Sequence, residues 1–179
     1  MPGRIDESRP FLAVNIALLT VSDSRTPETD TSGDLLAGRI AEAGHTLAAR
    51  LILPDDEDRL AAQFAAWAAD PEIDVVISTG GTGVPGRDVT PEALRRVIEK
   101  PIEGFGELFR WLSFAKIGTS TVQSRALAGV AKGTYFFAVP GSTSACRDAW
   151  DEILVLQLDN RHRPCNFVEL MPRLREHEA

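Results

Sequence analysis

The stretch Ser78-Thr-Gly-Gly-Thr-Gly-Val-Pro-Gly-Arg-Asp-Val-Thr-Pro-Glu-Ala93 sets closely spaced glycines between an apolar run and the start of a helix. The run 74–79 is expected to form a buried strand, and Thr90, followed by Pro91, is expected to cap a helix. Glycines let backbone N–H groups approach an anion without a Cβ in the way, and a helix start adds the positive end of its dipole. The stretch therefore predicts a strand, an anion-binding loop and a helix.

Predicted strands and helices alternate on both sides of this loop. The strands are expected at residues 13–21, 46–53, 74–79 and 134–139, and the helices at about 32–43, 56–69, from 90 to a stop at Pro101, 105–116, a short piece ending at Ala131, and 142–156. Residues 118–124 are expected to form a polar loop. Strands that alternate with helices pair in parallel, because each return in the same direction needs a crossover. We expect an α/β fold, a three-layer α/β/α sandwich with a mostly parallel sheet and binding loops at the carboxyl ends of its strands.

Length and composition predict one folded domain. The chain has 179 residues, of which 44% are hydrophobic and 25% charged, which suits a single core. Residues 1–12 are expected to be a flexible leader, residues 13–158 the domain, and residues 159–179 a tail that packs on the domain or on a neighbouring subunit. No apolar run approaches the ~20 residues that cross a bilayer, and Asp6 and Glu7 stand where a signal peptide would be apolar. Cytoplasmic localisation without a membrane partner is expected.

Charge and cysteine content exclude other classes of protein. The net charge of −7 repels nucleic acid, so no nucleic-acid partner is expected. Cys146 and Cys165 lack metal-ligand spacing with the histidines, which argues against a zinc site. A small anion can still bind locally at the glycine loop.

Two familiar nucleotide motifs do not fit the glycine loop. Gly81-Thr-Gly-Val-Pro-Gly86 matches the dinucleotide pattern G-x-G-x-x-G, but its last glycine does not open the helix. The acidic residue at the right distance, Glu103, follows Pro101 outside any predicted strand. A P-loop is excluded because no Gly-Lys-Ser/Thr sequence is present.

Asp88 adds a carboxylate to the predicted phosphate loop. A carboxylate beside a phosphate is repelled unless a cation lies between them, so Asp88 suggests Mg²⁺, which binds through carboxylates, water and phosphate oxygens. The alternative is that Asp88 only helps to cap the following helix.

Several motifs in the chain resemble the signature of the molybdopterin-binding family and fall in the family's order. They are Val21-Ser-Asp23, Thr79-Gly-Gly-Thr-Gly83, Arg87-Asp-Val-Thr-Pro-Glu-Ala93, Gly104-Phe-Gly106, Ser124-Arg125 and Pro140-Gly-Ser142. The similarity spans roughly Ile16 to Leu158, which is most of the chain. Three further stretches resemble the B branch of that family in particular, namely Glu103–Phe114, Gly118–Thr121 and Arg163–Phe167.

The resemblance implies a role in molybdenum cofactor biosynthesis, in which the terminal phosphate of molybdopterin attacks the α-phosphate of Mg·ATP. Adenylylated molybdopterin and pyrophosphate are the products of such an adenylyltransferase. Mg²⁺ would be the cofactor, and molybdopterin and ATP the substrates. The resemblance also implies a homo-oligomer, either a trimer or a hexamer, with other molybdenum cofactor enzymes as further partners. The alternative is a molybdopterin-binding or scaffold protein without catalytic activity.

The resemblance also assigns the site residues. Asp55 and Asp88 would be the catalytic residues and the metal ligands, with Asp56 open as the alternative to Asp55. Both Asp55 and Asp56 could instead be only the acidic start of a helix. The residues expected to contact the phosphates or the pterin are Ser22, Gly80, Gly81, Thr82, Gly83, Ser124, Gly141 and Ser142.

Overall fold

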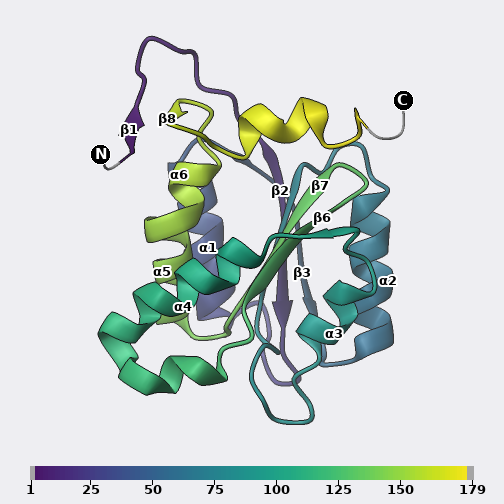
Figure 1. Ribbon diagram of the computed structural model, residues 1–179. Coiled ribbons are helices and arrows are strands. Elements are labelled where there is room, and N and C mark those ends of the chain that lie inside the picture. The colour runs from purple at the N-terminus through teal and green to yellow at the C-terminus, as the bar shows by residue number, and fades with distance from the viewer. Residues whose placement is uncertain (1–2, 177–179) are drawn as a thin grey trace.

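A six-stranded sheet forms the middle layer of the computed structural model, which describes residues 3–176 (Figure 1). The strand order is β3-β2-β4-β7-β6-β5. The first four strands in this order run parallel, and β6 is antiparallel to both of its neighbours. The strands are β2 (Asn15–Val21), β3 (Thr46–Leu53), β4 (Val75–Thr79), β5 (Lys100–Pro101), β6 (Leu127–Ala131) and β7 (Thr134–Val139).

Helices cover both faces of this sheet (Figure 1). One face carries α1 (Thr31–Glu42), α4 (Glu103–Ile117) and α5 (Thr143–Ala149), and the other carries α2 (Glu57–Ala68) and α3 (Thr90–Arg95). Helix α5 continues through a π-helical turn, Trp150–Leu154, into α6 (Val155–Gln157). The predicted three-layer, mostly parallel fold is therefore confirmed.

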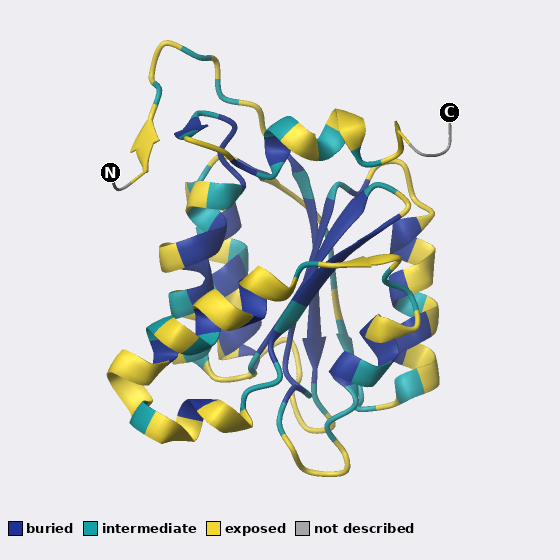
Figure 2. Ribbon diagram, in the orientation of Figure 1, coloured by how far each residue is buried: buried dark blue, intermediate teal, exposed yellow. Residues whose placement is uncertain are grey.

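The central strands are buried on both faces because each face meets a helical layer. In β2, Ile16 and Leu18 pack with α1 and α4, whereas Ala17 and Leu19 pack with α2. Figure 2 shows the buried residues along the sheet and on the inner sides of the helices. Such a strand reads as a continuous apolar run rather than an alternating one, as the sequence suggested.

Two predictions between residues 118 and 131 are wrong. The expected polar loop is a short 3₁₀ helix, η1 (Gly118–Gln123), and the helical piece expected to end at Ala131 is strand β6. Lys132 and Gly133 have φ values of 49° and 86°, and they connect β6 to β7 as a tight hairpin. A turn with two positive φ values matches the twist of antiparallel strands, so the turn and the pairing with β7 override the local helical preference.

The helix after the glycine loop also differs from expectation. It ends at Arg95 rather than near Pro101, and its N-cap is Val89, not Thr90. The Thr90 hydroxyl instead donates to the Gly80 carbonyl at 2.9 Å. The side chain predicted to cap the helix thus ties the helix start to the glycine loop.

The N-terminal segment lies beside the segment that follows α6 (Figure 1). Strand β1 (Arg4–Ile5) pairs with β8 (His162–Arg163), and the Leu12 N–H donates to Asn160 Oδ1 at 2.9 Å. The tail continues as a 3₁₀ helix, η3 (Val168–Arg173). The ends of the predicted leader and tail, residues 1–2 and 177–179, lie outside the described residues. Within residues 3–176, no helix has the length and apolar character to cross a membrane.

Helix α4 presents an apolar outer surface. Four of its large apolar side chains are exposed, with Trp111 reaching 72%. Surfaces of this kind are typical of protein interfaces. The four exposed side chains of α4 are those of Leu108, Trp111, Phe114 and Ile117.

Asp30 ties α1 to the sheet from a buried position, where its side chain is 1% exposed. Its carboxylate accepts hydrogen bonds from the Thr20 hydroxyl at 2.8 Å, the Gly33 N–H at 2.9 Å and the Arg50 guanidinium at 2.8 Å. Burial opposes ionisation, but these three donors outweigh it and hold the pKa of Asp30 below its ordinary value of 3.8. The ionised carboxylate therefore stabilises the fold.

We expect Asp30→Ala to lower the free energy of unfolding by about 3 kcal/mol, because Arg50 loses a buried partner. Asp34→Ala is the matched control, since Asp34 contacts the same Arg50 from a side chain that is 59% exposed, and it should cost less than about 1 kcal/mol. Urea denaturation measures both. The Asp30 contribution should be complete above pH 3.8 and fall away at lower pH, as the folded protein takes up the proton. Equal losses in the two variants would contradict this assignment.

Candidate functional site

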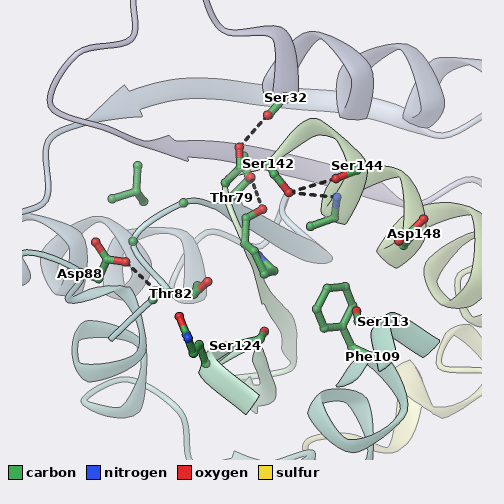
Figure 3. Close-up of a pocket in the computed structure, with 18 of the residues that line it drawn as sticks. Ser32, Thr79, Thr82, Asp88, Phe109, Ser113, Ser124, Ser142, Ser144 and Asp148 are labelled. Atoms are coloured by element: carbon green, nitrogen blue, oxygen red, sulfur yellow. Dashed lines mark hydrogen bonds between the residues drawn. The ribbon is translucent and has the colours of Figure 1, made fainter. Parts of the chain in front are cut away.

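A cavity of about 530 Å³ opens at the carboxyl ends of β2, β4 and β7 (Figure 3). Its walls come from the segments that follow these strands, from α4 and η1, and from α5. The volume lies in the range of small-molecule sites, and the position is where open α/β sheets bind ligands. Every predicted phosphate- or pterin-contacting residue lines this cavity, as does Asp88.

The glycine loop has a backbone that only glycine adopts readily. Gly80 and Gly81 have φ values of 103° and 64°. A Cβ on Gly80 would lie 2.2 Å from the Val21 carbonyl oxygen. The chain can therefore change direction directly after β4 while its backbone lies in close contact with the end of β2.

The loop amides divide into two pairs. The Gly80 N–H donates to the Val139 carbonyl at 3.1 Å, and the Gly83 N–H donates to Asp88 Oδ2 at 2.6 Å. The N–H groups of Gly81 and Thr82 meet no hydrogen-bond acceptor among residues 3–176. These two amides remain available to a ligand.

Arg125 holds the loop from the side away from the cavity. Its guanidinium donates to the Gly83 carbonyl at 2.8 Å and to the Asp88 carbonyl at 2.6 Å, and it pairs with the Glu92 carboxylate. Arg125 lines a second, smaller pocket rather than the main cavity. It therefore positions Asp88 without facing the space where a ligand would lie.

Asp55 lies behind the glycine loop. Its Oδ1 atom is buried and has no hydrogen-bond partner within the described part of the chain. A Cβ on Gly81 would lie 2.7 Å from that oxygen. Burial raises the pKa of Asp55, and the negative charges of Asp23 and Asp88 raise it further, against the opposing charge of Arg87. The fold thus brings an unsatisfied carboxylate to the predicted phosphate loop.

The neighbouring Asp56 has a different role. Its side chain accepts from the Arg59 N–H at 3.0 Å and caps α2. The Asp55 N–H donates to Asp23 Oδ1 at 3.1 Å, and Asp23 also pairs with Arg87. Of the two consecutive aspartates, Asp55 lies at the glycine loop and Asp56 starts the helix.

The carboxylates fit a divalent ion only together with other ligands. No group of three or more His, Cys, Asp or Glu side chains in residues 3–176 could hold a metal by itself. The unpartnered Asp55 oxygen nevertheless suits a cation, and Mg²⁺ usually takes one or two carboxylates plus phosphate oxygens and water. Asp55 and Asp88 could thus contribute to a divalent-ion site that other ligands complete.

The three predicted serines take part in local turns around the cavity. Ser22 Oγ accepts the N–H groups of Ser24 and Arg25, both at 3.2 Å. Ser142 Oγ accepts the Ala145 N–H at 3.2 Å and caps α5. Ser124 Oγ lies 3.4 Å from the Ala126 N–H. Ser142 Oγ also lies 3.3 Å from Ser144 Oγ, and either hydroxyl can be the donor of that bond. All three serine oxygens therefore belong to hydrogen bonds at the rim of the cavity.

The sequence interpretation missed other residues of this site. Phe109, Ser113 and Lys116 enter from α4 and Asp148 from α5, and Lys116 Nζ lies 2.5 Å from Asp148 Oδ1. Asp23 belonged to a recognised motif but had no assigned role. The α4 residues recur at helical spacing, which indicates a shared face but not that this face meets a cavity.

Comparisons with known proteins agree with this geometry. Residues 17–160 match the family model described as "Probable molybdopterin binding domain". Molybdenum cofactor biosynthesis protein B of Escherichia coli (strain K12) is 51% identical over 160 residues, covering 89% of this chain and 94% of the relative. The protein of the same name from Bacillus subtilis (strain 168) is 42% identical, covering 81% and 86%.

A crystal structure of a molybdenum cofactor biosynthesis protein B superposes with a TM-score of 0.81 at 39% identity, covering 84% of this chain and 94% of that one. The cavity at the strand ends and these similarities together show that the chain belongs to the molybdopterin-binding family, in the branch of molybdenum cofactor biosynthesis protein B.

Proposed function

We propose that this chain acts in molybdenum cofactor biosynthesis by binding molybdopterin and adenylylating it with Mg·ATP. The new bond joins an oxygen of the terminal phosphate of molybdopterin to the α-phosphorus of ATP. The bond between the α-phosphorus and the α,β-bridging oxygen breaks, and pyrophosphate leaves with its electron pair. The names of its relatives support the pathway. We also propose a homo-oligomer that covers the apolar face of α4.

The observation that carries the proposal is the buried, unpartnered Oδ1 of Asp55 beside the glycine loop. A desolvated carboxylate without a partner is costly, and such groups concentrate at functional sites. Asp55 and Asp88 would hold Mg²⁺ together with nucleotide phosphates. The ion, when bound, would offset the negative charge of those phosphates.

The residues of this chain contribute by positioning. The free N–H groups of Gly81 and Thr82 would hold a phosphate, and the Ser124 and Ser142 hydroxyls would orient the pterin substrate or its phosphate. Arg125 keeps the loop that carries Asp88 in place. Phosphoryl-type transfer needs little covalent chemistry from the protein, so fixed geometry and charge supply most of the rate.

One observation favours the alternative, a molybdopterin-binding protein without transferase activity. Asp88 Oδ2 already accepts the Gly83 N–H, which leaves fewer carboxylate lone pairs for a cation. Pyrophosphate release in the presence of molybdopterin, ATP and Mg²⁺ distinguishes the two functions. Substrate binding without release would support the alternative.

We expect Asp55→Asn and Asp88→Asn each to lower the rate of adenylylation by about 10²-fold, the size of effect seen when an electrostatic catalyst is removed. Asp56→Asn is the matched control, because asparagine caps a helix as well as aspartate does, and its rate should match the wild type. Pyrophosphate release measures all three. Wild-type rates in the Asp55 variant would refute the proposed role of this carboxylate.

A methyl group at Gly81 should damage the site, because it would meet the Thr90 hydroxyl at 2.4 Å and Asp55 Oδ1 at 2.7 Å in a positive-φ backbone. We expect Gly81→Ala to weaken ATP binding at least about tenfold, since the left-handed conformation costs about 1–2 kcal/mol for residues other than glycine and the loop would shift to relieve it. Gly86→Ala in the same loop meets no atom within 4 Å and should bind normally. Calorimetric titration with Mg·ATP compares the two; equal affinities would contradict a role for the Gly81 backbone.

The ionised side chain of Asp55 should also lower the free energy of unfolding of the protein. The raised pKa means that the ionised side chain is less favourable in the folded protein than in the unfolded one. Asp55→Asn should therefore raise the free energy of unfolding at pH 7, although it lowers activity. The gain should vanish as the pH falls below the ordinary carboxyl pKa of 3.8, where both states are protonated. A destabilised variant at pH 7 would contradict the unsatisfied state of the carboxylate.

A further inference from the structure

The cavity has two chemically different ends. The glycine loop and Asp88 form one end, and Figure 3 shows Phe109, Ser113 and Asp148 at the opposite end, with Ser142 and Ser144 between. The first end suits phosphates and a cation. The second end has an aromatic ring, hydroxyls and one carboxylate, a set that suits a flat heterocycle with polar edges.

Helix α4 supplies one wall of this second end. Phe109, Ser113 and Lys116 recur at helical spacing and lie on one face of the helix. Phe109 is 2% exposed and fixed within the core. Lys116 Nζ reaches across to Asp148 Oδ1 on α5 at 2.5 Å. The wall is therefore rigid at Phe109 and carries an ion pair at its end.

Asp148 is the carboxylate at this end that a ligand can use. Three carboxylates line the cavity, from Asp30, Asp88 and Asp148. The Asp30 carboxylate is occupied by three donors, and the Asp88 carboxylate accepts the Gly83 N–H at the other end. Within residues 3–176, the Asp148 carboxylate is paired only with Lys116, whose side chain is 58% exposed and can move into water at little cost.

An ionised carboxylate accepts hydrogen bonds and donates none. The pyrimidine edge of a pterin carries adjacent N–H donors, on the 2-amino group and on N3, which one carboxylate can accept together. Hydroxyls such as Ser113 and Ser144 can donate or accept, so they cannot by themselves select that pattern. A carboxylate can, because a polar site left unpaired by the wrong ligand costs binding energy.

We propose that Asp148 is the residue that makes this cavity specific for a 2-amino-4-oxo pyrimidine edge, by accepting hydrogen bonds from the 2-amino group and N3 of the pterin. This inference rests on the proposed function, since it assumes that the pterin substrate occupies the end of the cavity away from the glycine loop. The 2-amino group then takes the place of the Lys116 ammonium group at Asp148. The carboxylate selects the ring and takes no part in the transfer at the phosphates.

Pterin and lumazine test the assignment, because they share the bicyclic ring and differ in carrying an amino group or an oxygen at C2. Calorimetric titrations at pH 7 with each compound need neither ATP nor Mg²⁺. The wild type should bind pterin at least about tenfold more tightly than lumazine, the effect expected for a hydrogen bond to a charged group. Asp148→Asn should reduce this preference to within about twofold, because the amide also presents a donor to the ring.

Two control variants distinguish a role of the Asp148 carboxylate in specificity from an effect of losing its ion pair. Lys116→Gln removes the same ion pair but leaves the carboxylate, so it should keep the preference for pterin. Asp151→Asn removes a carboxylate from the turn that follows α5, where Asp151 pairs with Arg39 outside the cavity, and should also keep it. Thermal unfolding of each variant confirms that all are folded at the titration temperature.

Each possible result either supports or contradicts the role of Asp148 in selecting the pterin ring. A preference for pterin that is lost only in Asp148→Asn supports the proposal. A preference retained in that variant, lost equally in Lys116→Gln, or missing from the wild type overturns it, as does failure to bind either compound. Pyrophosphate release is measured separately, so an active transferase that ignores the C2 substituent would refute the role of Asp148 and leave the proposed function standing.

Discussion

The close approach of two strand ends is the constraint on which this site depends. Strands β2 and β4 are parallel neighbours, so the segments that follow them meet at one edge of the sheet. Gly80 lies so near the Val21 carbonyl that no side chain fits between them, and Gly81 leaves room for the Asp55 carboxylate. The loop can therefore present amides to the cavity on one side and meet a carboxylate on the other. A larger residue at either glycine would separate these groups.

Two aspartates show how the fold separates stability from function. Asp30 is buried with three donors, which keep its pKa low and bind α1 to the sheet. Asp55 Oδ1 has no donor among the described residues, and burial, followed by neighbouring negative charge, raises the pKa of Asp55. The first carboxylate stabilises the protein, and the second is held in an unfavourable state by the rest of the structure. Such an opposition is characteristic of a site kept for a ligand rather than for packing.

The rest of the fold supports this arrangement from behind. Arg125 closes the loop between Gly83 and Asp88 by donating to both carbonyls, and the Thr90 hydroxyl ties the start of α3 to Gly80. On the other side of the cavity, the Phe109 side chain of α4 packs into the core. The cavity therefore lies between two rigid walls, and its polar groups are positioned before any ligand arrives, which lowers the entropic cost of binding.

The sequence by itself determined the layer architecture and the place of the site. Buried parallel strands are recognisable because both of their faces are apolar, and the glycine loop is recognisable because its residue types suit positive φ values. The same reasoning was wrong at Leu127–Ala131, where a short apolar run could be helix or strand until β7 and the Lys132-Gly133 turn decided it. It also left Asp55 and Asp56 as alternatives. Only the tertiary structure showed that Asp56 caps α2 while Asp55 meets Gly81, and that Lys116 and Asp148 share a cavity, because these contacts join segments far apart in the chain. Local patterns report the conformation of a segment, whereas a site is made by the distances between segments, and packing sets those distances.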